Sequence, residues 1–277
     1  GILFALASLL SFSFSELATK LALNHNSKWK VILLGQLCGG GIILILTFLL
    51  DEWITIPSNG WWWLIGLAFA NFGGMFAYYK AMETKGVALT SSIANSWAII
   101  PIVLGIIVYE ERISWAQGVA MTLILLGIVL ILFKRGERFG VDRYLLFAIA
   151  SMIIWGLYFF SMKVPLLLMG AFVVASVTKI ITSLFAVPTM ISQKINLMNT
   201  TQKALWFILL VGFLDGVGFL TYNLAILKSA VSLVAPIISA VPVISVMLGV
   251  FILKEKLTFL QKIGIGTALV GLILISI

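Results

Sequence analysis

A long internal repeat constrains the fold of this chain more than any other feature of its sequence. Residues 78–131 align with residues 222–275 at a constant offset. Identical residues recur along the alignment as the pairs Tyr78 and Tyr222, Ala81 and Ala225, Leu89 and Leu233, Gly105 and Gly249, Glu111 and Glu255, Gln117 and Gln261, and Gly127 and Gly271. In each copy a charged turn separates two long apolar runs. A repeat of this length indicates one structural unit that is used twice.

The two copies belong to a chain that is too apolar for a water-soluble globule. Of its 277 residues, 62% are hydrophobic and 10% are charged, which predicts a membrane protein. The formal net charge of +8 is spread over short connections, a distribution typical of contact with lipid headgroups and not with nucleic acid. His25 and Cys38 are the single His and Cys of the sequence, so we expect no metal site and no cofactor.

Ten apolar runs are long enough to cross a membrane as helices, since a hydrocarbon core of about 30 Å requires roughly 20 residues. They cover about residues 2–23, 29–50, 61–82, 87–109, 113–133, 143–163, 166–191, 203–227, 230–253 and 257–277. Five runs fall in each half. Because five is odd, two homologous halves must enter the membrane in opposite directions. The predicted fold is therefore all-α and integral to the membrane, with ten transmembrane helices in two inverted five-helix repeats around a central cavity.

Two further patterns concern helix packing and membrane depth. Small residues four positions apart allow helices to approach closely in lipid, and the pairs are Gly35 and Gly39, Gly73 and Ala77, and Gly264 and Ala268. Tryptophans near span ends favour the membrane interface. We assign seven of them to such an aromatic belt: Trp29, Trp53, Trp61, Trp62, Trp63, Trp115 and Trp206.

Each half has a Glu-basic turn, Glu111-Arg112 or Glu255-Lys256, followed by Gln and a final span that contains Gly. The second half opens with Trp155-Gly156 and then Lys163, and Pro242 precedes Glu255. These motifs resemble those of the EamA-type members of the drug/metabolite transporter superfamily.

The first half departs from this pattern at two places. Phe12-Ser13 replaces Trp-Gly, although Lys20 keeps the spacing, and Pro101 lies closer to Glu111. The resemblance nevertheless covers essentially the whole chain, and we place the two repeats at residues 1–135 and 136–277.

The resemblance implies a carrier that exports or exchanges small metabolites through a cavity between the two halves. Members of the family are known for amino acids, other metabolites and toxic compounds, and relatives carry nucleotide sugars and sugar phosphates. Many members keep both termini in the cytoplasm. The excess of Lys and Arg in the connections after the odd-numbered spans places both termini outside instead, so the orientation is left open.

Three charged residues lie near the middle of predicted spans, where a charge costs on the order of 2.5–3.5 kcal/mol and requires a partner or a watery cavity. They are Glu16, Lys179 and Asp215. Glu16 is either a protonatable or substrate-binding group, or a structural one that pairs with Lys179 or stays neutral between helices. Asp215 aligns with Asn71 in the repeat, which suggests a polar layer at mid-membrane, and it could equally pair with Lys179.

A second set of candidate substrate-binding residues is aromatic and lies inside the spans, away from their ends. It comprises Tyr78, Tyr79, Trp97, Trp155, Tyr158 and Tyr222. A cavity that they line would hold an apolar or aromatic body, or an ammonium group through cation–π contact. Ordinary helix packing is the alternative for each single residue. The correspondence of Tyr78 and Tyr222 across the repeat favours these two as site residues.

Symmetry-related spans also carry helix-breaking residues. Asn95 and Pro101 lie in the fourth span, and Pro236 and Pro242 lie in the ninth. Proline inside a helix frees a carbonyl group and bends the helix. We predict that the three prolines form a hinge or gate, with a static kink as the alternative, and we include Asn95 among the substrate-binding residues.

These observations predict a monomeric secondary transporter, and not an enzyme, that exports a small metabolite across a prokaryotic cytoplasmic membrane by alternating access. An amino acid or similar amphipathic compound is the expected substrate, and proton coupling through Glu16 or Asp215 is a hypothesis. One alternative is an exporter of multiple drugs or cationic compounds. Others are an intramembrane lipid-processing enzyme, which the scarcity of His and Cys disfavours, and a membrane scaffold that transports nothing.

Overall fold

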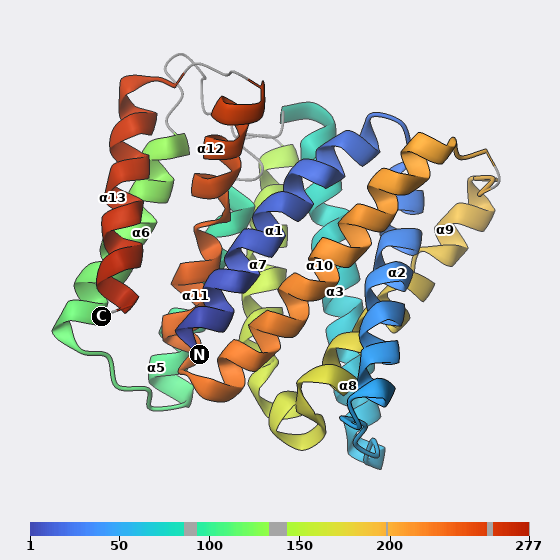
Figure 1. The fold of residues 1–277 in the computed structure, drawn as a ribbon, viewed down its shortest axis with the longest axis horizontal. Helices are drawn as coiled ribbons and strands as arrows, with labels where there is room; N and C mark the ends of the chain where they lie inside the picture. The colour runs from blue at the N-terminus through green and yellow to red at the C-terminus, as the bar shows by residue number, and fades with distance from the viewer. Residues whose placement is uncertain (86–92, 133–142, 198, 254–256, 277) are drawn as a thin grey trace.

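The computed structural model describes residues 1–85, 93–132, 143–197, 199–253 and 257–276, and the regular structure within them is helical. The helices form one bundle (Figure 1). Seven of the predicted spans form single helices: α1 (Ile2–Leu23), α2 (Lys28–Leu49), α3 (Ser58–Lys85), α6 (Trp115–Leu132), α7 (Arg143–Ser161), α10 (Gln202–Lys228) and α13 (Phe259–Ser276). The start of the fourth predicted span and Glu255 of the second charged turn lie outside the described residues.

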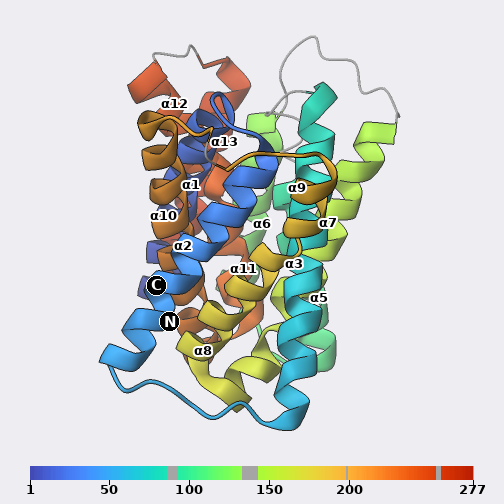
Figure 2. The same ribbon diagram turned by 90° about the vertical axis from the view of Figure 1, so that its right-hand side faces the viewer.

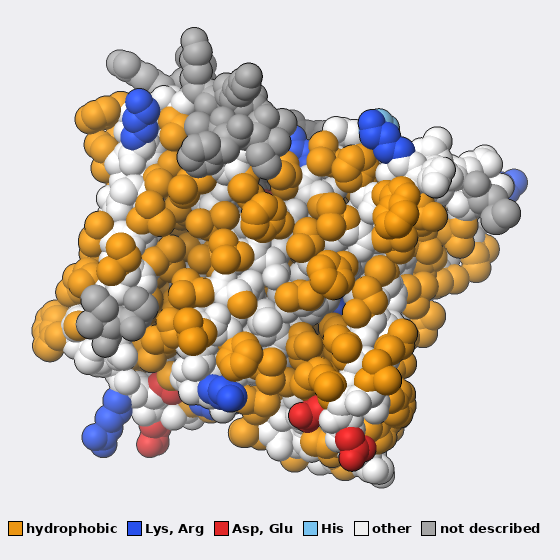
Figure 3. Space-filling model, in the orientation of Figure 1, with side chains coloured by type: hydrophobic (Ala, Val, Ile, Leu, Met, Phe, Trp, Pro, Cys, Tyr) orange, Lys and Arg blue, Asp and Glu red, His pale blue; other side chains and the backbone are white. Residues whose placement is uncertain are grey.

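The surface of the bundle is that of a membrane protein. Five of the described segments are long and apolar enough to cross a membrane, namely Ile2–Leu23, Lys28–Leu49, Lys163–Ser192, Gln202–Lys228 and Val231–Leu248. Hydrophobic side chains cover most of the face in Figure 3, and charged side chains gather mainly toward its upper and lower ends. Such a surface is favourable only where the middle of the bundle is surrounded by lipid.

Three predicted spans are interrupted, so the expectation of continuous helices is wrong at these places. The run 166–191 forms two helices, α8 (Lys163–Leu184) and α9 (Val187–Ser192). α8 itself is kinked at Gly170, whose φ is 72°. Glycine adopts this backbone conformation readily, whereas a residue with a side chain would be strained in it. The run 230–253 divides at Ala240 into α11 (Val231–Ser239) and α12 (Val241–Leu253). In the described part of the fourth span, the 3₁₀ turn η1 (Ser96–Ala98) precedes α5 (Ile99–Val108).

Prolines lie in the first turns of four helices. Pro101, Pro165, Pro188 and Pro242 lie in the first turns of α5, α8, α9 and α12, where the missing N–H group removes no helical hydrogen bond. Pro236 lies inside α11, one turn before the interruption at Ala240. The three residues predicted as hinges therefore lie at or next to interruptions, while hinge motion itself stays a prediction.

Helices from the two halves pack against each other in a repeated pattern. α6 lies along α13 (Figure 1), and α2 lies against α8 (Figure 2), so equivalent helices of the two halves meet. α1 packs on α10, and its counterpart α7 packs on α3. α3 runs upward in Figure 1, whereas its counterpart α10 runs downward. Contacts made by one half thus have counterparts in the other.

Glycines permit the closest of these approaches at two of the predicted small-residue pairs. A Cβ atom on Gly39 of α2 would lie 2.5 Å from the carbonyl oxygen of Gly212 in α10. A Cβ atom on Gly264 of α13 would lie 2.7 Å from the carbonyl oxygen of Gly127 in α6. Any side chain at these positions would push the two helices apart.

Two packing predictions are wrong. Gly73 is not a close-packing position, since a Cβ atom there would meet only a side chain at 3.9 Å, whereas one on Gly74 would lie 2.4 Å from Nε1 of Trp155. Trp29 does not belong to the exposed aromatic belt, because it is 5% exposed in a buried cluster with Tyr79 of α3 and Met190 of α9, and its ring stacks on Phe76 with centroids 6.0 Å apart. The other six belt tryptophans are exposed.

Candidate functional site

A cavity of about 180 Å³ lies inside the bundle and is lined by residues of both halves. Seven of the ten predicted substrate-binding residues line it: Glu16, Tyr78, Tyr79, Asn95, Trp97, Trp155 and Asp215. Its lining extends to Lys20 and Leu23 at the end of α1. We call the end of the bundle at the α1–α2 connection the open end.

The other three predicted residues do not line the cavity. Tyr158, Lys179 and Tyr222 are at most 2% exposed, and the Tyr222 hydroxyl donates to the Phe159 carbonyl oxygen at 3.1 Å. Tyr78 lies in the cavity although Tyr222 is its sequence counterpart. Both residues lie in the C-terminal part of their helix, Tyr78 in α3 and Tyr222 in α10. Because α3 and α10 run in opposite directions (Figure 1), the two residues lie toward opposite ends of the bundle.

An ion pair between α8 and α10 is the main charged feature at the inner part of the cavity. Lys179 donates to Asp215 Oδ2, and Gln36 of α2 bridges both groups. Its Nε2 atom donates to Asp215 Oδ2 at 2.9 Å, and its Oε1 atom accepts from Lys179 Nζ at 3.1 Å. The Lys179 side chain is 1% exposed and that of Asp215 is 17% exposed. Lys179 thus has the carboxylate partner that its burial requires.

Glu16 of α1 lies elsewhere in the cavity wall and has different partners. It accepts from the Tyr78 hydroxyl at 3.3 Å and from Ser245 Oγ of α12 at 2.7 Å. The suggested ion pair of Glu16 with Lys179 is therefore not formed, since Lys179 binds Asp215. These hydrogen bonds connect the carboxyl group of α1 to helices from both halves.

Asn71, the sequence counterpart of Asp215, also lines the cavity. Its Nδ2 atom donates to Thr182 Oγ1 of α8 at 3.5 Å. Gln36, which was not among the predicted residues, lines the cavity as well, while a polar layer at mid-membrane stays a prediction. The sequence feature that could have identified Gln36 is its polar amide within the apolar run 29–50.

Aromatic side chains form much of the remaining wall. Tyr78 and Trp155 lie with ring centroids 5.3 Å apart, and Trp97 stacks on Phe159 at 4.2 Å. Phe12 and Phe219 also line the cavity, with an edge-to-face contact at 5.3 Å. Nothing in the sequence separates these two phenylalanines from those that face lipid. The wall offers π faces to an apolar, aromatic or cationic body.

A second ion pair joins the two halves at the opposite end, which we call the closed end. Glu111, between α5 and α6, accepts from Lys163 Nζ at 2.8 Å. It also accepts from the backbone N–H groups of Val231 and Ser232, at 3.0 and 2.9 Å. These N–H groups begin α11, so the carboxylate caps that helix and lies at the positive end of its dipole. The Glu111 carboxylate therefore has a structural role at the start of α11.

The electrostatics of Glu111 follow from these contacts. Burial by itself would raise the pKa of this carboxyl group, but hydrogen bonds from Lys163, Ser232 and Val231 outweigh burial and lower the pKa below its usual value. The Lys163 ammonium also lies 4.2 Å from the centroid of the Tyr109 ring. Glu111 therefore stays ionised at neutral pH.

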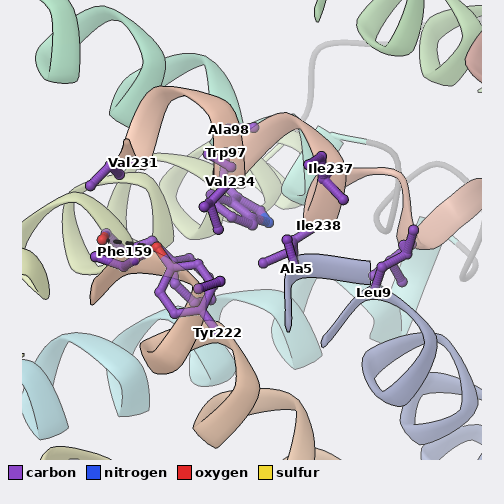
Figure 4. Packing of buried hydrophobic residues seen from close by; sticks show 14 of the residues in the cluster. Ala5, Leu9, Trp97, Ala98, Phe159, Tyr222, Val231, Val234, Ile237 and Ile238 are labelled. Carbon is purple, nitrogen blue, oxygen red and sulfur yellow. Dashed lines mark hydrogen bonds between the residues drawn. The ribbon is translucent and has the colours of Figure 1, made fainter. Parts of the chain in front are cut away.

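Apolar packing fills the bundle between the cavity and the closed end. Figure 4 shows Trp97, Phe159 and Tyr222 packed together with Val234 and Ile238 of α11. Trp97 is 3% exposed, and the cluster around it is buried. Among the described residues, neither Glu111 nor Lys163 of the closed end lines the cavity.

The described residues contain no group of three or more His, Cys, Asp or Glu side chains that could hold a metal ion.

Comparisons with known proteins address the chain as a whole. The model of the EamA-like transporter family matches residues 1–133 and 142–277. An uncharacterised protein of Methanocaldococcus jannaschii is 39% identical over 82 residues, and the match spans 30% of this chain and 60% of that protein. A solved structure described only as the crystal structure of a protein covers 100% of this chain and 98% of its own, with a TM-score of 0.85 and 20% identity. At this identity the likeness concerns the fold alone.

Proposed function

We propose, because this chain belongs to the EamA-like transporter family, that it is a secondary carrier which moves a small amphipathic metabolite by alternating access. Members of the family are membrane transporters and not enzymes. One observation carries the proposal: in the described part of the chain, a cavity with charged and aromatic walls is lined by helices of both halves, and its lining extends to Lys20 and Leu23 at the open end. A carrier must hold its solute at a site that is accessible from one side at a time.

The repeated packing pattern supports an inverted arrangement of the two halves. α6 meets its counterpart α13, α2 meets its counterpart α8, and α1 on α10 corresponds to α7 on α3. Two units related by a two-fold axis in the membrane plane would pack in this way. Exchange of the conformations of the two halves would then close the open end and open the closed end.

The charges that line the cavity support an amino acid or a similar compound as the substrate. Glu16 and Asp215 could receive an ammonium group, Lys20 near the open end could receive a carboxylate, and aromatic rings would hold the apolar body. A second candidate, a cationic compound, is favoured by a specific observation. Lys179 is enclosed behind Asp215, so carboxylates dominate the charged lining of the cavity interior.

The distribution of charges at the two ends supports the export direction. The open end carries Lys20, Lys28, Lys30 and Lys203 at the end of α1 and the starts of α2 and α10, whereas Arg112, Lys163 and Lys228 lie toward the closed end. By the positive-inside rule, this excess of Lys favours an open end that faces the cytoplasm of a prokaryotic cell. In this conformation a cytoplasmic solute could enter the cavity.

Transport by the purified chain in proteoliposomes tests the proposal. We expect counterflow of at least one solute from a panel of amino acids, sugar phosphates and cationic drugs, above the flux in protein-free liposomes. Trp155→Leu, which alters the cavity wall, should reduce this flux, whereas Trp62→Leu on the 78% exposed belt residue should not. If no solute of the panel crosses faster than in protein-free liposomes, the chain is better described as a scaffold.

A pH gradient across the same vesicles tests proton coupling. If Glu16 or Asp215 carries the coupled proton, Glu16→Gln or Asp215→Asn should abolish pH-driven accumulation of the transported solute. Unchanged accumulation in both variants would remove these carboxyl groups from coupling and favour facilitated diffusion or exchange. Light scattering of the solubilised protein at several concentrations tests the expected monomer.

A further inference from the structure

The ion pair in the cavity is asymmetric with respect to solvent. Asp215 lines the cavity and its side chain is 17% exposed, whereas the Lys179 side chain behind it is 1% exposed. A solute that enters the cavity can therefore approach the carboxylate. It cannot approach the ammonium group, which is the usual protein ligand for a substrate carboxylate.

The surroundings of Lys179 hold its ammonium group in this position. Gln36 Oε1 accepts from it at 3.1 Å, and the Phe219 ring centroid lies 4.2 Å from it. The lysine backbone is held as well, because a Cβ atom on Gly40 of α2 would lie only 3.1 Å from Lys179 Cβ. The side chain thus extends from a fixed base toward Asp215.

Asp215 both accepts hydrogen bonds from the protein and lines the cavity. Lys179 and Gln36 both donate to its Oδ2 atom, and Asp215 lines the cavity together with the aromatic residues Phe12 and Phe219. Glu16 and Lys20 of α1 are the other charged residues among those that line the cavity. A carboxylate beside π faces is a favourable site for an organic ammonium group.

We propose that Lys179 is a tethered competitor of the substrate: its ammonium group occupies Asp215 while the cavity is empty and yields part of this carboxylate to the cationic group of an arriving solute. This inference rests on the proposed carrier function and assigns Lys179 a specificity-determining role there. A neutral ion pair lets the empty carrier change conformation without an uncompensated buried charge. A competitor on the same chain weakens binding of the solute, since it acts at a high effective concentration.

Binding of benzyltrimethylammonium to the full chain in nanodiscs, measured by isothermal titration calorimetry, tests this role. This probe carries a fixed positive charge on an aromatic body, and benzoate serves as the anionic comparison. Lys179→Met should bind the cation about tenfold more tightly than the wild type. Asp215→Asn and the double variant Lys179→Met/Asp215→Asn should both lose binding. Benzoate affinity should not change in any variant.

Lys203→Met is the matched control, since it removes one positive charge from an exposed position at the start of α10. It should bind the cation as the wild type does. The melting temperature of each variant establishes that it is folded. If Lys179→Met does not fold, Lys179→Arg replaces it. This variant keeps the positive charge and binds a carboxylate with two N–H groups, so it should weaken cation binding.

Several results would overturn the inference. They are unchanged or weaker cation binding by folded Lys179→Met, wild-type affinity in Asp215→Asn, equal affinity of wild type and Lys179→Arg, and no cation binding by either wild type or Lys179→Met. The solute panel in proteoliposomes separates this failure from failure of the carrier proposal. If the wild type transports a solute but Lys179→Met binds the cation with unaltered affinity, only the inference about Lys179 is refuted and the carrier proposal stands.

Discussion

Two ion pairs among the described residues, Lys163 with Glu111 and Lys179 with Asp215, are built in opposite ways. At the closed end the carboxylate is the enclosed partner, with the Glu111 side chain 6% exposed and that of Lys163 25% exposed. In the cavity the ammonium is enclosed, with Lys179 at 1% and Asp215 at 17%. The partner that reaches solvent is the one that can exchange its contacts. The comparison suggests that the first pair holds two halves together and that the second pair is available to a solute.

Asp215→Asn should have the largest effect on stability, because it leaves the ammonium of Lys179 enclosed without a carboxylate. Breaking a buried ion pair by removal of one partner costs about 3–5 kcal/mol, and we expect the lower part of this range since Gln36 still accepts from Lys179. Equilibrium unfolding of the solubilised protein measures the loss. The double variant Lys179→Met/Asp215→Asn should recover most of it, and an equally unstable double variant would contradict this explanation.

Glu111→Gln should have the next largest effect, about 2 kcal/mol, from the loss of charge-assisted hydrogen bonds to Lys163 and to the start of α11. It should cost less than Asp215→Asn because the Lys163 ammonium can reach water. The same unfolding measurement compares the two variants. If Glu111→Gln lowered the free energy of unfolding more than Asp215→Asn does, the explanation based on the enclosed Lys179 ammonium would be wrong.

Lys163→Met should cost only about 1 kcal/mol, since Glu111 keeps both backbone N–H donors and the lost partner is partly exposed. Lys228→Met, which removes an exposed Lys in the last turn of α10, controls for the change in net charge. A loss as large as that of Glu111→Gln would show that the ammonium, and not the helix cap, is the main partner of Glu111.

The pH dependence of stability should reveal the smallest difference. The pKa of Glu111 is lower in the folded chain than its ordinary value of 4.5, so its contribution is fully present above about pH 4.5 and is lost as the pH falls through the folded pKa. The difference in unfolding free energy between wild type and Glu111→Gln should therefore shrink below pH 4.5. A difference that grows on acidification would contradict the assigned sign.

The sequence predicts the membrane fold and much of the cavity because both depend on the free energy of placing single side chains in an apolar environment, which residue type determines. A charge such as Glu16 or Asp215 within an apolar run requires polar surroundings wherever the helix lies, and both residues line the cavity. Phe12 and Phe219 could not be recognised, since a phenylalanine has the same local cost beside a cavity, in the core or in lipid.

The repeat also has a limit as a guide to the site. Tyr78 and Tyr222 are equivalent in sequence, but a cavity that reaches one end of the bundle gives equivalent positions different surroundings. The kink at Gly170 could not be predicted from the sequence either. The sequence contains 24 glycines, and it does not reveal which of them adopts a positive φ. Both features depend on tertiary arrangement.

Because Gly40 of α2 has no Cβ atom, α2 can pack closely against α8, and this packing affects the ion pair in the cavity. Gly40 faces α8 so closely that a Cβ atom would lie 2.9 Å from Ile180 Cγ1 and 3.1 Å from the Ser176 carbonyl oxygen. A methyl group at this position would act as a wedge that moves the base of Lys179 relative to Asp215. A substitution as small as Gly40→Ala would therefore change the ion pair between Lys179 and Asp215, although no solute in the cavity contacts Gly40.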